Sequence, residues 1–340
     1  MQRPTVDIDN EGGLRLAAAH ATAGLSLEAG AAFVGTGSEG PDIVFDASGP
    51  TSGARRHPVP AALLVHGDVE HLPFARGSIG GARSWMTHLH VPPRRLPLAL
   101  WDLHRALAVG APLELRAMAG DEQGGTGPGG ELGGRCNAGW PPARLVDVVT
   151  GAGFTVELGS VTESGGEIRL RAVRARTLAD TVGTGMRLLV CGVNPSIYSA
   201  DFGVGYARPG NRFWKAALAA GIVGHDRDPV DAVIAHGVGM TDFVKRPTRA
   251  AAEVDPDEYL AGFARVVRLV EWLRPGAVCF TGLSGWRTVV NPKAAPGLQS
   301  EPIGGRPAYV MPSTSGRNAR TPVDELSAHL LAAWMCAEAG

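Results

Sequence analysis

The chain of 340 residues lacks the features that mark membrane, secreted and metal-rich proteins. It has no run of about 18 uncharged apolar residues, and no basic stretch leads into an apolar run near the N-terminus. Its four cysteines are scattered, which argues against a disulfide framework, a zinc knuckle and an iron–sulfur cluster. We therefore expect a soluble, reduced protein of the cytoplasm with no metal site and no membrane partner.

The chain also lacks a strong excess of either charge. Lys and Arg together number 32 against 33 for Asp and Glu, so the chain is neither a polycation nor an acidic tail. Hydrophobic residues make up 44%, which at this length is enough for the cores of two domains. Residues 174–185 form a link rich in charge, threonine and glycine, so we expect one domain over residues 1–176 and another over 177–340.

The C-terminal half alternates short apolar runs with amphipathic segments. The apolar runs predict buried strands over residues 187–192, 277–282 and 308–312. Helical spacing predicts helices over residues 211–220, 259–273 and 324–337. This alternation indicates a three-layer α/β domain, in which loops at the carboxyl ends of the strands carry the site.

The first motif with chemical content is Gly192-Val193-Asn194-Pro195-Ser196, directly after a predicted strand. Glycine permits a tight turn and proline fixes the exit of the loop. An amide is a poor base, but the carbonyl of Asn194 can hold and orient a water molecule. The alternative is a turn asparagine that bonds its own backbone.

Two further loops follow in the same half. Tyr206, in the segment 206–214, can stack on a planar base, whereas Phe213 and Trp214 fit a core better. Residues 311–320 follow another predicted strand, and there Arg317 projects among small hydroxyl residues whose N–H groups can grip phosphates.

In this order and spacing, and with the intermediate stretch Gly239-Met240-Thr241-Asp242-Phe243-Val244-Lys245-Arg246-Pro247-Thr248, the chain from about residue 178 onward resembles the mismatch-specific uracil/thymine-DNA glycosylase family of the uracil-DNA glycosylase superfamily. The resemblance implies a three-layer α/β/α fold. It also implies that Asn194 positions the hydrolytic water, Tyr206 stacks on the extruded base and Arg317 is the wedge that enters the base stack.

The resemblance further implies base excision repair: hydrolysis of the N-glycosidic bond of uracil, with thymine or damaged pyrimidines as further substrates, after base flipping. The partner would be double-stranded DNA with G·U or G·T mismatches, at the nucleoid, and no cofactor is expected. The implied base-binding residues are Gly192, Val193, Pro195, Ser196, Ser199 and Tyr206. The implied DNA-binding residues are Arg208, Ser313, Thr314, Ser315, Gly316 and Arg317.

The N-terminal half resembles a class I S-adenosylmethionine-dependent methyltransferase, a Rossmann-like α/β fold. The resemblance rests on residues 67–74, where Asp68 would meet the adenine, on residues 103–113, and on Asp46, which would bind the ribose. Residues 30–40 contain Gly35-Thr36-Gly37 but not the glycine-rich turn between strand and helix that the cofactor needs. We expect a degenerate domain that does not bind S-adenosylmethionine.

Two alternatives remain. One is a bifunctional or regulatory protein with an active methyltransferase domain, and the other is a non-catalytic binder of DNA lesions.

Overall fold

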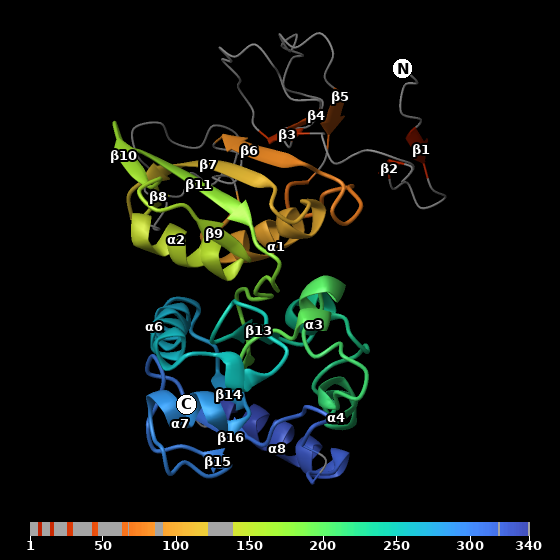
Figure 1. The fold of residues 1–340 in the computed structure, drawn as a ribbon, viewed down its shortest axis with the longest axis vertical. Helices are drawn as coiled ribbons and strands as arrows, with labels where there is room; N and C mark the ends of the chain where they lie inside the picture. Colours follow the sequence, from red (N-terminus) through yellow and green to blue (C-terminus); the bar gives the residue numbers. More distant parts are fainter. Residues whose placement is uncertain are drawn as a thin grey trace. The chain divides into compact units, whose positions relative to one another are not determined.

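The computed structural model describes backbone and side chains at residues 68–84, 91–121, 139–318 and 320–337 (Figure 1). It describes the backbone alone at residues 85 and 338 and in five strands that precede residue 67. The chain forms two compact units, Met1–Thr150 with Phe154–Ala175, and Gly151–Gly153 with Arg176–Gly340.

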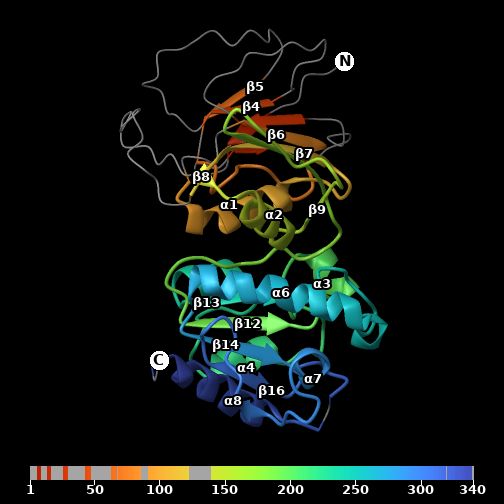
Figure 2. The same ribbon diagram turned by 90° about the vertical axis from the view of Figure 1, so that its left-hand side faces the viewer.

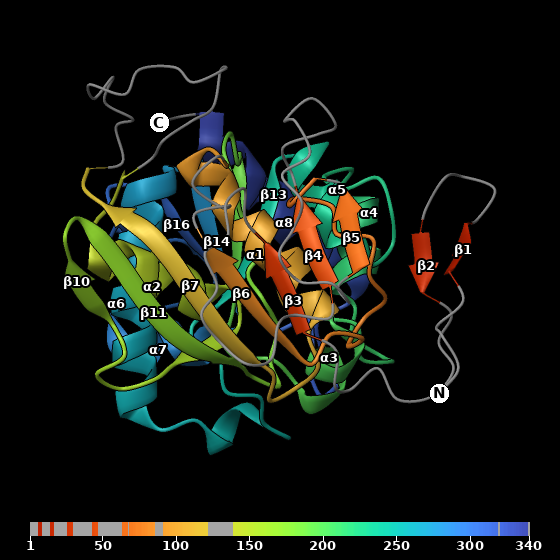
Figure 3. The same cartoon turned by 90° about the horizontal axis from the view of Figure 1, so that it is seen from above.

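The first unit is built on a mixed sheet whose strands follow the order β10-β11-β7-β6-β3-β4-β5 (Figure 3). Neighbouring strands from β7 to β5 are parallel, and β11 is antiparallel to β7. The strands span β3 Ser26–Ala29, β4 Ile43–Asp46, β5 Leu63–His66, β6 Gly81–Trp85, β7 Pro112–Ala119, β10 Thr162–Ser164 and β11 Glu167–Arg174. Short strands β8 (Gly139–Trp140) and β9 (Phe154–Val156) pair with β7 and β11, and β1 (Val6–Ile8) pairs with β2 (Leu14–Leu16).

This strand order is doubly wound. The chain places β4 and then β5 on one side of β3, and returns to place β6 and β7 on the other side. Such a reversal defines a Rossmann-like sheet. Helices α1 (Leu96–Ala106) and α2 (Pro142–Gly151) lie on one face of it (Figures 1 and 2). The expected Rossmann-like α/β fold of the N-terminal half is therefore confirmed.

The residues expected to matter for a cofactor in this unit are only partly described. Residues 30–40 lie outside the described residues, and so does the side chain of Asp46. Asp68 is described: its carboxylate accepts the Glu70 N–H at 2.9 Å and lies 3.1 Å from Nδ1 of His71. This carboxylate is therefore engaged within its own turn.

The second unit contains a five-stranded sheet in the order β13-β12-β14-β16-β15. Strands β12 (Leu188–Gly192), β13 (Val238–Asp242), β14 (Ala277–Thr281) and β16 (Ala308–Met311) are parallel, and β15 (Gly297–Leu298) is antiparallel. The chain places β13 on one side of β12 and β14 on the other. The carboxyl end of β12 therefore lies where the strand order reverses, which is where such sheets bind ligands.

Helices cover both faces of this sheet (Figure 2). Alternate strand residues such as Leu188 and Val190 pack with α4 (Phe213–Ala219) and α8 (Val323–Met335). The intervening positions face α6 (Pro256–Leu273) and α7 (Leu283–Val289), where the ring of Phe280 lies 4.8 Å from that of Trp286. Two short helices, α3 (Ile197–Phe202) and α5 (Pro229–Ile234), complete the unit. The three-layer α/β/α architecture expected from the sequence is confirmed.

The strand β13 was not predicted by hydrophobic periodicity. Its sequence Val-Gly-Met-Thr-Asp contains a glycine and two polar residues, so it forms no apolar run. The strand is buried nonetheless, because it pairs with β12 along its whole length.

No helix in the described part of the chain is both long enough and apolar enough to cross a membrane.

Gly262 allows α6 to approach the chain that follows β13. A Cβ at this position would lie 2.0 Å from the carbonyl oxygen of Phe243. We predict that Gly262→Ala lowers the free energy of unfolding by about 1–3 kcal/mol, since overpacking outweighs the helix preference of alanine. Urea unfolding measures the change.

The matched control is Gly205→Ala, because a Cβ there would meet its nearest neighbour, Sδ of Met240, only at 3.9 Å. Equal stability of Gly262→Ala and the wild type would show that α6 does not need this close approach.

Candidate active site at the end of β12

The side chain of Asn194 is held in one orientation at the carboxyl end of β12. Its Nδ2 donates to the carbonyl of Arg246 at 2.9 Å and to Oγ1 of Thr248 at 2.8 Å. The Thr248 hydroxyl in turn donates to the Ala250 carbonyl at 2.8 Å, so it receives the amide hydrogen on a lone pair. Both amide hydrogens are thus used, and the carbonyl Oδ1 of the half-buried Asn194 remains the acceptor that can hold a water.

The partners of Asn194 belong to a loop that continues the sheet beyond its strands. The N–H groups of Phe243 and Val244 donate to the carbonyls of Gly192 and Val193 at 2.9 and 3.0 Å. The N–H of Thr248 donates to the carbonyl of the next motif residue, Pro195, at 3.1 Å. The loop over residues 243–248 therefore runs beside the Asn194 motif and is bonded to its main chain.

A bidentate ion pair anchors the same loop to α6. Arg246 donates through Nε and Nη2 to the two carboxylate oxygens of Glu258, at 2.8 and 2.6 Å. Glu258 also accepts the N–H of Asp255, the residue that caps α6. The carbonyl that holds Asn194 is therefore carried by a residue whose side chain is fixed to a helix start.

The ring of Tyr206 lies on a strained turn and has one covered face. Its φ is 59°, in the left-handed region, and its ring stacks on the buried Phe213 at 4.2 Å between centroids. Its hydroxyl is 2.9 Å from Oγ1 of Thr281, at the end of β14. Burial raises the pKa of this phenol well above its ordinary value, so it stays neutral. The carboxyl ends of β12 and β14 thus bring Asn194 and a polar aromatic group to one edge of the sheet.

Asp242 also belongs to this site, and sequence reasoning assigned it no role. It ends β13 opposite Gly192, and a Cβ on Gly192 would lie 2.3 Å from Oδ1 of Asp242 and 3.2 Å from the hydroxyl of Tyr206. Burial raises the pKa of this carboxyl to about 6, although the nearby Lys245 opposes the shift. The available signal was an acid inside the family-like stretch of residues 239–248. Gly192 is needed because the carboxyl and the phenol converge on its Cα.

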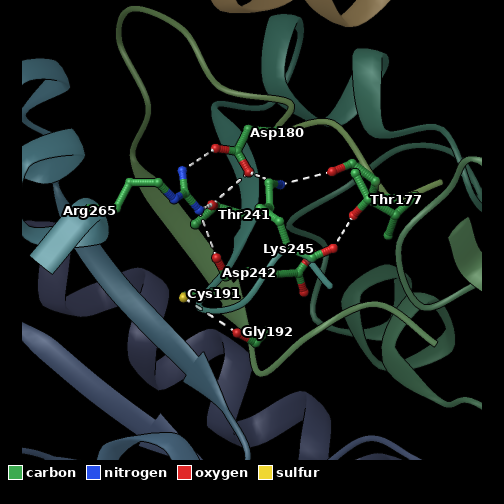
Figure 4. Close-up of polar contacts among 9 residues, drawn as sticks. Thr177, Asp180, Cys191, Gly192, Thr241, Asp242, Lys245 and Arg265 are labelled. Atoms are coloured by element: carbon green, nitrogen blue, oxygen red, sulfur yellow. Dashed lines mark hydrogen bonds and ion pairs between the residues drawn. The ribbon is translucent and has the colours of Figure 1, made fainter. Parts of the chain in front are cut away.

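A buried ion network lies beside Asp242 (Figure 4). The carboxylate of Asp180 accepts from Nη1 of Arg265 at 2.8 Å, from Nζ of Lys245 at 2.5 Å and from the hydroxyl of Thr241 at 2.7 Å. Burial alone would raise the pKa of Asp180, but the two cations hold it below its ordinary value. Arg265 also donates to the main-chain carbonyl of Asp242 at 2.8 Å, so the network fixes the end of β13.

Ser196 and Ser199 cap the first turn of α3. The Ser196 hydroxyl accepts the N–H of Ser199 at 3.1 Å and lies 3.1 Å from its hydroxyl. Ser199 is buried, at 3% exposure. The cap gives both hydroxyls a structural partner, and their contact with a base stays a prediction.

The loop after β16 presents the residues expected to contact DNA. Arg317 and Gly316 are exposed, whereas Thr314 is buried at 2% exposure. Arg208, on the segment that follows Tyr206, is exposed as well. The contacts of all these residues with DNA stay predictions. The described residues contain no group of three or more His, Cys, Asp or Glu side chains suited to a metal ion.

These features define an α/β domain with an oriented amide, a tyrosine ring stacked on Phe213 and a half-buried acid where its strand order reverses. Residues 180–335 match the family model of the uracil DNA glycosylase superfamily. The resemblance of this part of the chain to the superfamily, expected from the sequence, is therefore confirmed at the level of the superfamily.

Solved structures similar to this chain include S-adenosylmethionine-dependent methyltransferases. One from Methanosarcina mazei is 16% identical, with 39% of this chain and 82% of that chain covered and a TM-score of 0.32. A possible histamine N-methyltransferase from Thermotoga maritima is 20% identical, with 39% and 73% covered and a TM-score of 0.30. A 1,6-didemethyltoxoflavin N1-methyltransferase from Burkholderia thailandensis is 18% identical, with 44% and 71% covered and a TM-score of 0.34.

The raised pKa of Asp242 gives its ionised form an unfavourable free energy in the folded protein. This penalty is absent at pH values below about 4, the pKa of Asp242 in the unfolded chain. It grows as the pH rises toward 6, the pKa in the folded protein, and is complete above pH 6. We predict that Asp242→Asn raises the free energy of unfolding at pH 7.5 by about 1–3 kcal/mol, and with it the unfolding temperature. This gain in stability disappears near pH 4. Thermal unfolding across this pH range tests it.

Asp257→Asn, at an exposed carboxyl in the first turn of α6, is the control for removal of one negative charge. A stability gain of Asp242→Asn that did not change between pH 4 and 7.5 would contradict the account of Asp242.

Proposed function

We propose that this protein is a DNA-repair glycosylase that flips uracil out of mismatched double-stranded DNA and hydrolyses its N-glycosidic bond, which leaves an abasic site. Thymine and damaged pyrimidines opposite guanine are further candidate substrates. The observation that carries the proposal is the fixed amide of Asn194, whose two N–H groups are held by Arg246 and Thr248. Its free carbonyl oxygen supports a role in holding the attacking water.

Base extrusion comes first, and its free-energy cost accounts for the roles that we propose for Arg317 and Tyr206. Taking a base out of the duplex costs a few kcal/mol, and less when the pair is mismatched. Arg317, exposed at the tip of the loop after β16, fills the gap that the base leaves. The ring of Tyr206 stacks on the flipped base, and such a contact recovers about 1–3 kcal/mol. Discrimination then follows local duplex stability rather than a tight pocket alone.

During bond cleavage, different groups of the site act on the sugar and on the departing base. Positive charge develops on the sugar as the bond breaks, and Asn194 steers a water toward the sugar carbon. Negative charge develops on the departing pyrimidine, where N–H groups of the loop after β12 act as an oxyanion hole does. Asp242 lies at the base end, beside Gly192 and the Tyr206 hydroxyl. Below a pH of about 6 its neutral carboxyl donates toward the departing base, whereas above that pH the ionised carboxylate repels it.

We also propose that residues 1–176 form a degenerate methyltransferase domain that serves as a scaffold or positions DNA, and that the protein works at the nucleoid in the cytoplasm. The carboxylate of Asp68, bonded within its own turn, supports the loss of adenine binding. Equilibrium dialysis with S-adenosylmethionine tests this: absence of binding is expected, and micromolar binding would support a working methyltransferase domain instead.

Asn194→Ala removes the group that holds the water and leaves the DNA-contacting surface intact. We predict that it lowers the single-turnover rate of uracil release from a G·U duplex about a hundredfold or more while duplex binding is retained. Alkaline cleavage of abasic sites measures the rate, and a gel shift measures binding.

The matched control is Asn291→Ala, which alters an asparagine whose Oδ1 accepts the Lys293 N–H in a turn after α7. A full rate for Asn194→Ala would show that the amide does not position water. If even the wild type in excess yielded no alkali-sensitive strand break, the protein would be a lesion binder without catalysis.

Arg317→Ala removes the wedge. We predict weaker binding to a G·U duplex and slower uracil release, because the gap left by the flipped base is no longer filled. Titrations at several salt concentrations measure the affinity, and single-turnover assays measure the rate.

Lys293→Ala removes the same charge from an exposed position outside the site and is the control. A phosphate contact alone would lower the salt slope by about 1 without slowing excision by bound enzyme, and that result would contradict the wedge role.

A further inference from the structure

Arg212, immediately before α4, binds the loop that carries Arg317. Its guanidinium donates to the main-chain carbonyls of Ser315, Asn318 and Thr321, with 3.1 Å between Nη2 and the Ser315 oxygen. Its own N–H donates to the Thr314 carbonyl at 3.0 Å. One residue therefore bonds four carbonyls of the segment 314–321, although more than 100 positions separate the two in sequence.

The planar guanidinium is required for this arrangement. It presents a rigid set of N–H donors that can serve several carbonyls at once, whereas an ammonium is a compact point charge on a flexible stem. The rest of the loop is held by short-range bonds, such as that from Nδ2 of Asn318 to the Ser313 carbonyl at 3.0 Å. Arg212 thus ties the loop to the body of the domain.

The tip of the loop also rests on the segment that precedes Arg212. A Cβ on Gly316 would lie 2.9 Å from the carbonyl oxygen of Gly210, so the two backbones are in contact there. Gly316 directly precedes the exposed Arg317. The position of Arg317 relative to the body of the domain is therefore set by the backbone at Gly210 together with the bonds of Arg212.

The residue after Arg212 supports the stacking ring. Phe213 is fully buried, and its ring covers one face of Tyr206 at 4.2 Å between centroids. Two consecutive residues at one helix start thus hold the wedge loop and the stacking ring. Base extrusion is favourable only when the wedge fills the gap and the Tyr206 ring stacks on the base at the same time. Either contact alone offsets only part of the free-energy cost of a few kcal/mol.

We propose that Arg212 is a positioning residue for base extrusion. It holds Arg317 where its side chain can enter the DNA base stack while the flipped base stacks on the Tyr206 ring that Phe213 supports. This inference rests on the proposed function, and it assigns the coupling of wedge and base pocket to one side chain.

The test measures extrusion separately from bond cleavage. The probe is a duplex with a G·U pair in which the uridine carries a 2′-fluorine that blocks cleavage, next to 2-aminopurine, whose fluorescence rises when its neighbour leaves the stack. We expect Arg212→Lys to reduce the fluorescence rise about fivefold or more, and uracil release from an ordinary duplex by a similar factor. Arg287→Lys, at an arginine that donates twice to the Ala294 carbonyl on another loop, keeps wild-type values.

Two further variants separate positioning from a general loss of structure. Gly316→Ala adds a methyl group against Gly210 at an exposed tip, and we expect it to lower extrusion while the melting temperature stays unchanged. The double variant Arg212→Lys/Arg317→Ala is expected to lose no more extrusion than Arg317→Ala alone, because Arg212 acts through the wedge.

Wild-type extrusion by Arg212→Lys, or full additivity in the double variant, would overturn this inference. Extrusion by the wild type without uracil release would contradict the proposed function alone, since the Arg212 comparison would still be read from the fluorescence.

Discussion

The chemistry that we propose for this site depends on one side-chain amide whose hydrogens are both in use. A free asparagine at a strand end would rotate and offer water either a donor or an acceptor. Here the Arg246 carbonyl and the Thr248 hydroxyl take both hydrogens of Asn194, so its carbonyl oxygen is the atom left to accept from a water. An uncharged group thereby acquires a direction, which is what the proposed hydrolysis without a strong base requires.

The rest of the domain keeps those two partners in place. The loop over residues 243–248 follows the Asn194 motif through main-chain bonds, and its Arg246 is fixed to Glu258 on α6. Beneath it, the buried carboxylate of Asp180 holds Arg265 and Lys245, and Arg265 fixes the end of β13. Breaking such a buried pair typically costs about 3–5 kcal/mol, because the remaining charge is left without a partner. The surroundings of Asn194 are thus held by several bonds, while Arg317, the proposed wedge, is exposed.

Local pattern was enough to predict the layers and the position of Asn194. Residues 187–192 form an apolar run closed by glycine, and the strand is observed at Leu188–Gly192. The run over 277–282 and the amphipathic segment over 259–273 likewise correspond to β14 and α6. What sequence could not provide were the contacts between distant segments: Asn194 with Thr248, Asp242 with Gly192, and Arg212 with the loop after β16. The first and third are hydrogen bonds and the second is a strand pairing, each across 50 or more residues, for which no hydrophobic period exists.

The most direct test of the account is to follow the oxygen of the attacking water. Excess protein is incubated in ¹⁸O-labelled water with a duplex that holds a single G·U pair, and the products are examined by mass spectrometry. The account predicts free uracil and an equal amount of abasic strand with one ¹⁸O on the sugar carbon that carried the base. An intact duplex after prolonged incubation, with no uracil released, would contradict it.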